Sequence, residues 1–262
     1  MADFASESGH WYAPNGEPRY TILAKNGIER ATTLRDARKE GWYPSVTGII
    51  RCAAVPGLEK WKRKQLGLAL LTLPRLPDET EDAFLLRAEK DAEEQALKAR
   101  EKGTEIHGYL ESYFRDQAVP GIPTAYDHIH GCAKLLLAEV GKQEWRVERS
   151  YAHALGYGCK IDLHSAEWVI DYKSKEFTLA QADDLVTYDE HHMQLAANRR
   201  AAGIPKARCA IVFVSQSEAG LSVFRPVCED DLVRGLAMFD ALHAYWKAAN
   251  RYDPAALQKK AA

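Results

Sequence analysis

The strongest constraint on the fold is a change of hydrophobic period about halfway along the chain. The run AYDHIHGCAKLLLAEV has helical spacing, and three runs then follow in which apolar and polar residues alternate: EWRVERSYAH, GCKIDLH and EWVIDYKSK. A period of two is typical of half-buried strands. The connections ALGY and SAE are short, so we expect these runs to form a three-strand antiparallel meander.

Helical segments flank this meander on both sides. We expect helices over about 57–73, 125–140, 178–202 and 230–250, and two helices over 78–114 that are interrupted or kinked near Gly103. ARCAIVFVS is mostly apolar, as a buried strand is, and LSVFRPV is its expected hairpin partner. The order of elements predicts an α/β fold with a central mixed sheet flanked by helices.

The chain divides into two expected parts. Residues 1–42 form an N-terminal extension with a candidate β-hairpin around Asn26 and Gly27, and residues 43–262 form one domain with a helical insertion at about 58–117. Ser45 or Thr47 in YPSVTGII is suited to cap the helix that follows. A length of 262 residues is enough for one substantial core.

Composition and cysteine usage constrain the compartment and the partners. A net charge of -2 counts against a broad basic nucleic-acid-binding surface, although local basic patches can coexist with it. The 5 cysteines are scattered without a Cys-x-x-Cys pair, which favours free thiols in a reducing compartment and gives no support for structural zinc. MADFASESGH does not resemble a secretory signal, and the apolar run LGLALLTL stops at Pro74. We therefore expect a cytoplasmic protein without a membrane partner.

An acid and a base share one face of the third alternating run. In VIDYK, Asp171 and Lys173 are two residues apart, so their Cα atoms should be about 6 to 7 Å from each other. A loop of two or four residues through Ser165 would add Asp162 to the same face, whereas a three-residue loop would separate it. Two carboxylates can hold Mg²⁺ or Mn²⁺, and a lysine can orient water or stabilise a phosphate oxygen. The alternative is a cross-strand salt bridge on a solvated sheet face.

A histidine upstream has a related pattern. In KGTEIHGYLESYF, His107 and Glu111 are four residues apart and therefore lie on one face of a helix. The alternative is a histidine that packs or caps.

Taken together, these motifs resemble the PD-(D/E)XK nuclease superfamily in its RecB-like branch. That branch includes CRISPR-associated RecB-like nucleases and phage-type and mitochondrial genome maintenance exonucleases. The resemblance covers about residues 43–215 and depends on YPSVTGII, GTEIH, WRVERSY, GCKID, VIDYK and HHMQLAAN, in the family's order. It implies a restriction-endonuclease-like core with an N-terminal helical elaboration.

The resemblance also implies a role for each matched residue. It assigns the metal to His107, Asp162, Asp171 and the backbone carbonyl of Tyr172, and the cofactor would be Mg²⁺ or Mn²⁺. Asp162 lies one residue further from Gly158 than in the shorter form of the motif. Some relatives bind an iron–sulfur cluster through three cysteines near the C-terminus, and this sequence lacks that group, so no cluster is expected.

Three further residues complete the expected catalytic set. Lys173 matches the terminal lysine, Glu148 supports the site, and Gln194 matches the glutamine of the family's Gln-x-x-x-Tyr motif. The fourth residue after Gln194 is Asn198 instead of tyrosine, which puts any tyrosine contact to DNA in doubt.

A basic run precedes these motifs in the helical insertion. In similar RecB-like exonucleases, helices of this kind cover the site and admit a single strand by threading. The run can contact phosphates through its cations and stack bases on its tryptophan, with a solvated helix face as the alternative. Its residues are Lys60, Trp61, Lys62, Arg63 and Lys64.

The function expected from these features is metal-dependent cleavage of DNA. The resemblance points to an exodeoxyribonuclease that acts on single-stranded DNA or free ends, in recombination, repair or phage DNA processing. One alternative is a catalytically inactive DNA-binding module with the nuclease fold. Another is an iron or zinc enzyme that uses four other histidines, His153, His164, His191 and His192.

Overall fold

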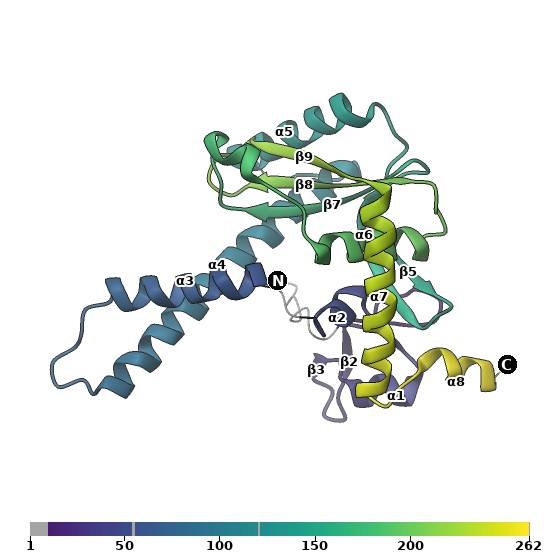
Figure 1. Cartoon of the computed structure of the whole chain (residues 1–262), viewed down its shortest axis with the longest axis horizontal. Coiled ribbons are helices and arrows are strands. Elements are labelled where there is room, and N and C mark those ends of the chain that lie inside the picture. The colour runs from purple at the N-terminus through teal and green to yellow at the C-terminus, as the bar shows by residue number, and fades with distance from the viewer. Residues whose placement is uncertain (1–9, 54–55, 120, 262) are drawn as a thin grey trace.

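The computed structural model describes residues 10–53, 56–119 and 121–261, and its centre is a five-stranded mixed sheet (Figure 1). The strands are, in spatial order, β5 (Arg146–His153), β6 (Tyr157–His164), β7 (Trp168–Lys175), β8 (Arg208–Ser215) and β9 (Ser222–Val227). Neighbours pair antiparallel except β7 and β8, which are parallel. The expected α/β fold with a mixed sheet is confirmed.

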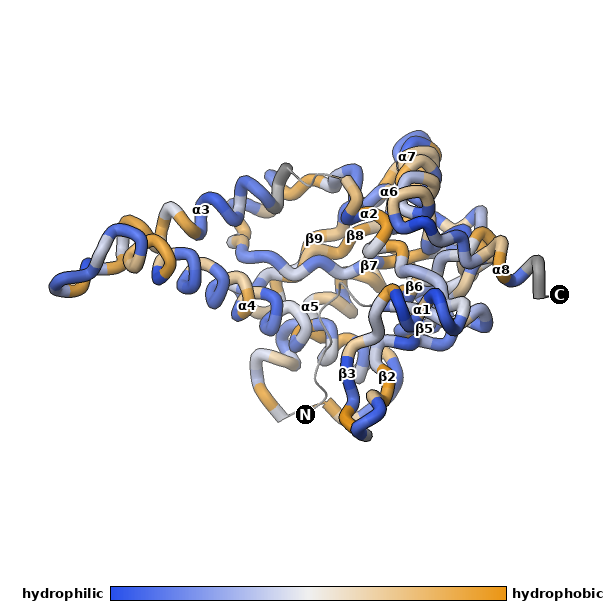
Figure 2. The backbone as a smooth tube through the Cα atoms, turned by 90° about the horizontal axis from the view of Figure 1, so that it is seen from below, coloured by the Kyte–Doolittle hydropathy of each residue, from blue (hydrophilic) through white to orange (hydrophobic). Residues whose placement is uncertain are grey.

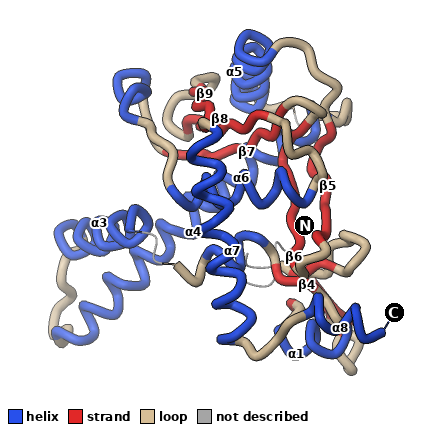
Figure 3. The backbone as a smooth tube through the Cα atoms, turned by 45° about the vertical axis from the view of Figure 1, so that its right-hand side comes forward, coloured by secondary structure: helices blue, strands red, loops and turns tan. Residues whose placement is uncertain are grey.

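Helices cover both faces of this sheet (Figure 3). One apolar cluster joins the sheet to α2 (Val46–Ile50), α6 (Asp189–Ala201) and α7 (Glu229–Ala249). The other cluster joins the opposite face to α4 (Glu81–Phe114) and α5 (Pro123–Val140). The remaining elements are β1 (Trp11–Tyr12), β2 (Thr21–Leu23), β3 (Glu29–Ala31), α1 (Leu34–Glu40), β4 (Tyr43–Pro44), α3 (Pro56–Thr72), η2 (Leu179–Asp184) and α8 (Pro254–Ala261).

The N-terminal segments follow their local sequence signals. β2 and β3 form the expected hairpin, and Gly27 in its turn has a φ of 76°, a conformation that favours glycine. Ser45 caps α2, because its Oγ accepts a hydrogen bond from Gly48 N–H at 2.9 Å. Trp11 belongs to the apolar cluster under α2, α6 and α7.

The expected interruption near Gly103 is wrong, since one helix, α4, runs from residue 81 to 114. Gly103 is buried, and a Cβ atom there would lie 2.6 Å from Ser174 Oγ. This glycine therefore allows α4 to approach β7 closely and does not end the helix. The first half of α4 pairs with α3 as an arm that extends away from the sheet, as Figures 1 and 2 show.

A second difference concerns the helix expected over 178–202. A short 3₁₀ segment (η2) occupies 179–184, and α6 begins only at Asp189. The side chain of Arg225 donates hydrogen bonds to the carbonyls of Ala182 and Leu185, which fixes the chain between the two segments in a non-helical path. Within the described residues, no helix combines the length and the apolar character needed to cross a membrane.

The glycine at position 131 is expected to be a strict packing requirement. A Cβ atom on Gly131 would lie 2.0 Å from the backbone oxygen of Gly220, and backbone cannot move aside as a flexible side chain can. Gly131→Ala should lower the free energy of unfolding by about 1 to 3 kcal/mol through overpacking. The matched control is Gly67→Ala on α3, where a Cβ meets nothing within 4 Å and a stabilisation of up to about 1 kcal/mol is expected. Urea denaturation measures both, and a Gly131→Ala protein as stable as the parent would contradict this packing.

Candidate metal centre

The candidate site lies where β6 and β7 separate. These strands pair only at Leu163↔Ile170 and His164↔Val169, while β7 pairs with β8 along all 8 of its residues. In this register Asp162 would be the partner of Asp171 if the pairing continued by one more residue. The connection between the paired residues His164 and Val169 has four residues, 165–168, and an even number directs both acids to the same face of the sheet.

Asp162 fills the gap between the separating strands. Its Oδ2 accepts a hydrogen bond from the backbone N–H of Tyr172 at 2.8 Å, in place of a backbone carbonyl. The residues on either side of it, Ile161 and Leu163, pack in opposite apolar clusters, although strict alternation would place both on one face. Strand β6 therefore twists at Asp162, whose carboxylate reaches Tyr172 on β7.

Asp171, Lys173 and Gln194 form the second part of the site. Asp171 is only 3% exposed, and its Oδ2 lies 2.8 Å from the Nζ of Lys173. Gln194 on α6 joins both, since its Nε2 donates to Asp171 Oδ1 at 2.6 Å and its Oε1 accepts from Lys173 Nζ at 3.2 Å. The helix thus fixes the orientation of the acid and of the base.

His107 brings α4 to the same place. One ligand atom from each of His107, Glu148 and Asp162 lies within 4.8 Å of the other two, and His107 Nδ1 is 3.8 Å from Asp162 Oδ2. The ring of His107 also contacts the Tyr172 ring edge-on at 5.8 Å. Asp171 is not a member of this group of three. Glu111, which lies on α4 one turn after His107, forms an ion pair with Arg115.

Glu148 has a strained backbone. Its φ is 50°, in the left-handed region that non-glycine residues rarely adopt, and it is missing from the pairs that join β5 to β6. Its carboxylate forms an ion pair with Lys160 and is 8% exposed. Strain of this kind costs about 1 to 3 kcal/mol and often accompanies functional sites. Lys160, two residues before Asp162 in GCKID, is a site residue to which the sequence did not assign a role.

The electrostatics of the site favour a bound cation. Burial and the charge of the neighbouring Asp162 raise the pKa of Glu148 to about 7, although Lys160 opposes the rise. Burial and the charge of Asp171 also raise the pKa of Asp162. Burial and Lys173 lower the pKa of His107, so its imidazole is neutral at pH 7 and its ring nitrogens can serve as ligands. A cation among these groups would relieve the repulsion between the carboxylates.

The donor atoms fit a hard divalent ion. Mg²⁺ and Mn²⁺ take carboxylate and carbonyl oxygens, Mg²⁺ at about 2.0 to 2.1 Å, and Mn²⁺ also accepts imidazole. Tyr172 adds a fourth candidate: the N–H and C=O of one strand residue point the same way, so its carbonyl faces β6 as its N–H does. The residues that would hold the ion are therefore Asp162, His107, Glu148 and the carbonyl of Tyr172, with Asp171 next to them.

Mn²⁺ binding should strengthen as the pH rises. A carboxyl group with a raised pKa retains its proton at neutral pH, and the ion must displace that proton. Affinity should therefore be lower at pH 6 than at pH 8, and binding should release protons. Calorimetry in two buffers with different heats of ionisation measures this release, and Glu148→Gln should reduce it. Equal affinity at both pH values without proton release would contradict the assignment.

The four other histidines do not form a metal site. Among the described residues, one group of three potential metal ligands lies close together, and it consists of His107, Glu148 and Asp162. None of the four other histidines belongs to this group. His164 Nε2 is 2.7 Å from the hydroxyl of Tyr151, and His153 stacks on Tyr157.

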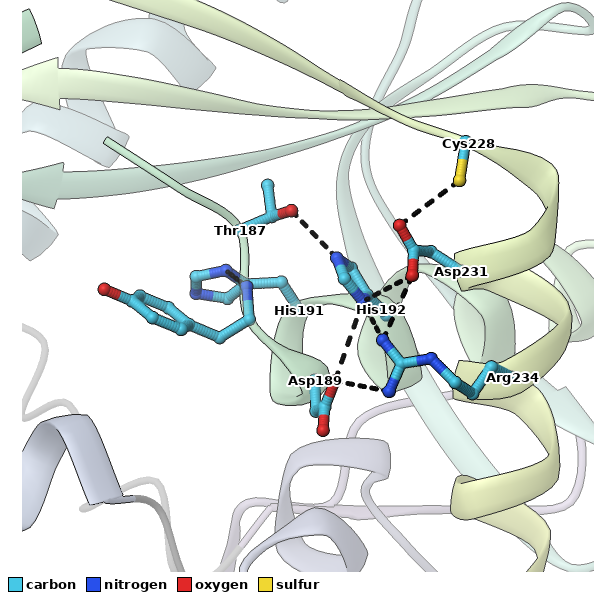
Figure 4. A network of polar contacts seen from close by, with 8 residues as sticks. Thr187, Asp189, His191, His192, Cys228, Asp231 and Arg234 are labelled. Carbon is cyan, nitrogen blue, oxygen red and sulfur yellow. Dashed lines mark hydrogen bonds and ion pairs between the residues drawn. The ribbon is translucent and has the colours of Figure 1, made fainter. Parts of the chain in front are cut away.

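His191 and His192 point in different directions from α6, as Figure 4 shows. His191 Nδ1 accepts the N–H of Tyr188 at 3.1 Å, and His192 Nε2 lies 2.8 Å from Thr187 Oγ1. The other nitrogen of His192, Nδ1, faces Asp231 and Arg234 on α7. His192 is therefore buried because it packs between α6 and α7. The iron or zinc alternative therefore lacks a ligand set.

The basic run lies on α3 in the arm. Its four cations are exposed and Trp61 is half-buried, in a pocket of about 160 Å³ between α3, α4 and the end of β7. Lys62 forms an ion pair with Glu59 at 3.3 Å. Glu176, which directly follows β7, also lines this pocket, so the arm meets the sheet at the end of the strand that carries Asp171 and Lys173.

Comparisons with known proteins give weak similarity. No protein-family model and no curated protein matches the sequence. Among solved structures, an alkaline exonuclease (LHK-Exo) from Laribacter hongkongensis is 15% identical in sequence, with a TM-score of 0.39. The alignment covers 78% of this chain and 97% of the exonuclease chain. The structure of SSO0001 is also 15% identical, with a TM-score of 0.24, and the alignment covers 71% of this chain and 86% of the SSO0001 chain. Both scores are low, so the function must be inferred from the geometry of the site.

Proposed function

We propose that the protein is a divalent-metal-dependent deoxyribonuclease of the PD-(D/E)XK type, with a restriction-endonuclease-like core. The observation that supports this most strongly is the meeting of Asp162, Asp171 and Lys173 where β6 and β7 separate, with His107 and Glu148 beside them. The cofactor is Mg²⁺ or Mn²⁺, and the substrate is DNA. A structural salt bridge would need only Asp171 and Lys173, and it leaves the other three residues unexplained.

The side chains divide the chemistry among them. A divalent ion, when bound, activates water and offsets negative charge on the phosphate. Asp162, His107, Glu148 and the carbonyl of Tyr172 would hold the ion, and Asp171 fixes the ammonium of Lys173 through an ion pair. Lys173 orients the attacking water or stabilises a phosphate oxygen through a hydrogen bond. Gln194 holds Asp171 and Lys173 in their mutual orientation.

The test of this function uses end-labelled linear DNA, single-stranded and double-stranded, with Mg²⁺, Mn²⁺ or a chelator. Cleavage should occur with at least one of the two ions and stop in the chelator. Cleavage that is equally fast in the chelator, or no cleavage of either DNA with either ion, would refute the proposal.

We further propose that the enzyme is an exonuclease that needs a free end. The near-neutral net charge gives little electrostatic attraction to long duplexes, because such binding depends on many cationic contacts to phosphate. The exposed cations of α3 and the ring of Trp61 are suited to one unpaired strand, which the arm would guide toward β7.

A covalently closed single-stranded circle tests the need for an end. With Mn²⁺ or Mg²⁺, linear single-stranded DNA should be degraded and a circle of the same length should persist. Nicking the circle once should restore degradation, which is the matched control. Equal rates of loss for circle and line would show that the enzyme cuts internally.

A further inference from the structure

A second pocket lies directly beside the candidate centre. Its volume is about 100 Å³, and Lys160 and Gln194 form the wall that it shares with the site. The opposite wall comes from the N-terminal segments, where His10, Tyr12 and Tyr20 line it. A ligand in this pocket would therefore be adjacent to the reacting phosphate.

Aromatic rings form one wall of this pocket. The half-buried rings of His10 and Tyr20 are stacked, with centroids 4.1 Å apart and an angle of 20° between their planes. Tyr12, which is 2% exposed, holds Tyr20 in place through a hydrogen bond of 2.9 Å between the two hydroxyls. A planar ligand can extend such a stack, as bases do on aromatic side chains.

Asn198 supplies a buried polar group to the same pocket. It is 1% exposed, and its Oδ1 has no hydrogen-bond partner within the described part of the chain. It follows Gln194 by four residues on α6, so both side chains lie on one face of the helix. A buried acceptor without a partner is costly, and a ligand that donates a hydrogen bond there would remove that cost.

The chemistry of the lining favours a neutral ring over an anion. Lys160 is the one lysine or arginine in the lining, and it already forms an ion pair with Glu148. The group that lacks a partner is an acceptor, and a phosphodiester of DNA has no hydrogen to donate to it. The pocket therefore fits a flat group with an N–H donor better than it fits a phosphate of the DNA backbone.

We propose that this pocket binds an unpaired nucleobase with an exocyclic amine, and that adenine fits best. An asparagine amide accepts from N6 and donates to N7 of adenine at the same time. The base extends the stack of Tyr20 and His10, and Asn198 forms hydrogen bonds with its edge. The inference rests on the proposed function only in taking the ligand to be a DNA strand.

Binding to labelled oligonucleotides in a chelator tests the pocket without cleavage. The parent should bind single-stranded oligo(dA) about 5- to 150-fold more tightly than oligo(dT) of the same length, the range for one bidentate contact to a base. Asn198→Leu and the smaller Asn198→Ala should each remove this preference. Fluorescence anisotropy gives the affinities, and thermal unfolding confirms that at least one variant is folded.

Substitutions of Tyr20 separate stacking from edge recognition. Tyr20→Ala should weaken binding to oligo(dA) by about 5- to 150-fold through the loss of one stacked base. Tyr20→Phe, which keeps the ring, should retain most of the affinity. Tyr245→Ala removes a tyrosine that is 60% exposed on α7 and should leave binding unchanged.

The outcomes for the pocket and for the nuclease are distinct. Equal parental affinity for oligo(dA) and oligo(dT), or a preference that survives both Asn198 substitutions, would overturn the pocket even if the parent cleaves DNA with Mn²⁺. A preference that Asn198→Ala removes, in a protein that does not cleave DNA, would support the pocket and refute the nuclease.

Discussion

Asp162→Asn should lower the rate of metal-dependent DNA cleavage by more than about 100-fold. Loss of a residue that only supports a metal ligand lowers metal affinity or activity by about 10- to 100-fold, and loss of a ligand itself should cost more. Asparagine has the same shape, and its Oδ1 can still accept the N–H of Tyr172 across the gap between β6 and β7. The variant should therefore remain folded. It loses the negative charge of a carboxylate that lies close to His107 and Glu148.

A matched Asp→Asn substitution controls for general effects. Asp230 is exposed in the first turn of α7, and Asp230→Asn should change stability by no more than about 0.5 kcal/mol and leave cleavage unchanged. Rates with Mn²⁺ and Mg²⁺ are compared with thermal unfolding of each variant. A folded Asp162→Asn protein that cleaves DNA as fast as the parent would remove Asp162 from the centre.

Lys173→Met should lower the rate of cleavage by about 100- to 10,000-fold and retain metal binding. The ammonium lies between Asp171 and Gln194, and it is the cation that we place next to the attacking water and the phosphate. Loss of a group that orients or protonates in the transition state costs about 100- to 10,000-fold in rate. Since Lys173 is positive, its removal should leave Mn²⁺ affinity equal or higher.

The combination of two readouts separates a catalytic from a structural role for Lys173. Calorimetry should show Mn²⁺ binding to Lys173→Met at least as tight as to the parent, while the cleavage assay shows the loss. Lys206→Met, at an exposed lysine before β8, is the matched control and should change neither. If Lys173→Met lost Mn²⁺ binding and cleavage together, the lysine would be a support for the site and not a participant in the reaction.

The elements that depend on local patterns could be predicted from the sequence. The alternation in GCKIDLH and EWVIDYKSK predicts β6 and β7. The length of their connection, which decides whether Asp162 shares a face with Asp171, follows only from the pairing of the strands. The hairpin at Gly27 and the cap at Ser45 likewise follow from residue type. These features involve neighbours in the chain, for which spacing is sufficient.

Features that depend on distant contacts could not be predicted in the same way. From the sequence alone, Gly103 predicts a break in the helix. The contact with Ser174 on β7, which explains the glycine, appears only in the folded chain. The end of η2 depends on Arg225, which comes from a later strand. The aromatic wall at His10 and Tyr20 belongs to an N-terminal segment that no motif connects to the site, and only folding places it beside Gln194.

The site itself shows the same division. Sequence spacing relates Asp171 to Lys173, whereas the twist of β6 at Asp162 and the left-handed φ of Glu148 are visible only in three dimensions. In the folded chain Glu148 and His107 lie close to Asp162, while Asp171 contacts Lys173 and Gln194.

Anomalous diffraction from a crystal of the parent protein soaked in Mn²⁺ tests the central claim most directly. We expect one strong peak within about 2.3 Å of an oxygen of Asp162, with His107, Glu148 and the Tyr172 carbonyl also in contact, since ligand distances for such ions are close to 2.1 Å. The same soak of Asp162→Asn should give a much weaker peak. A peak elsewhere on the protein, or none at saturating Mn²⁺, would contradict a metal centre where β6 and β7 separate.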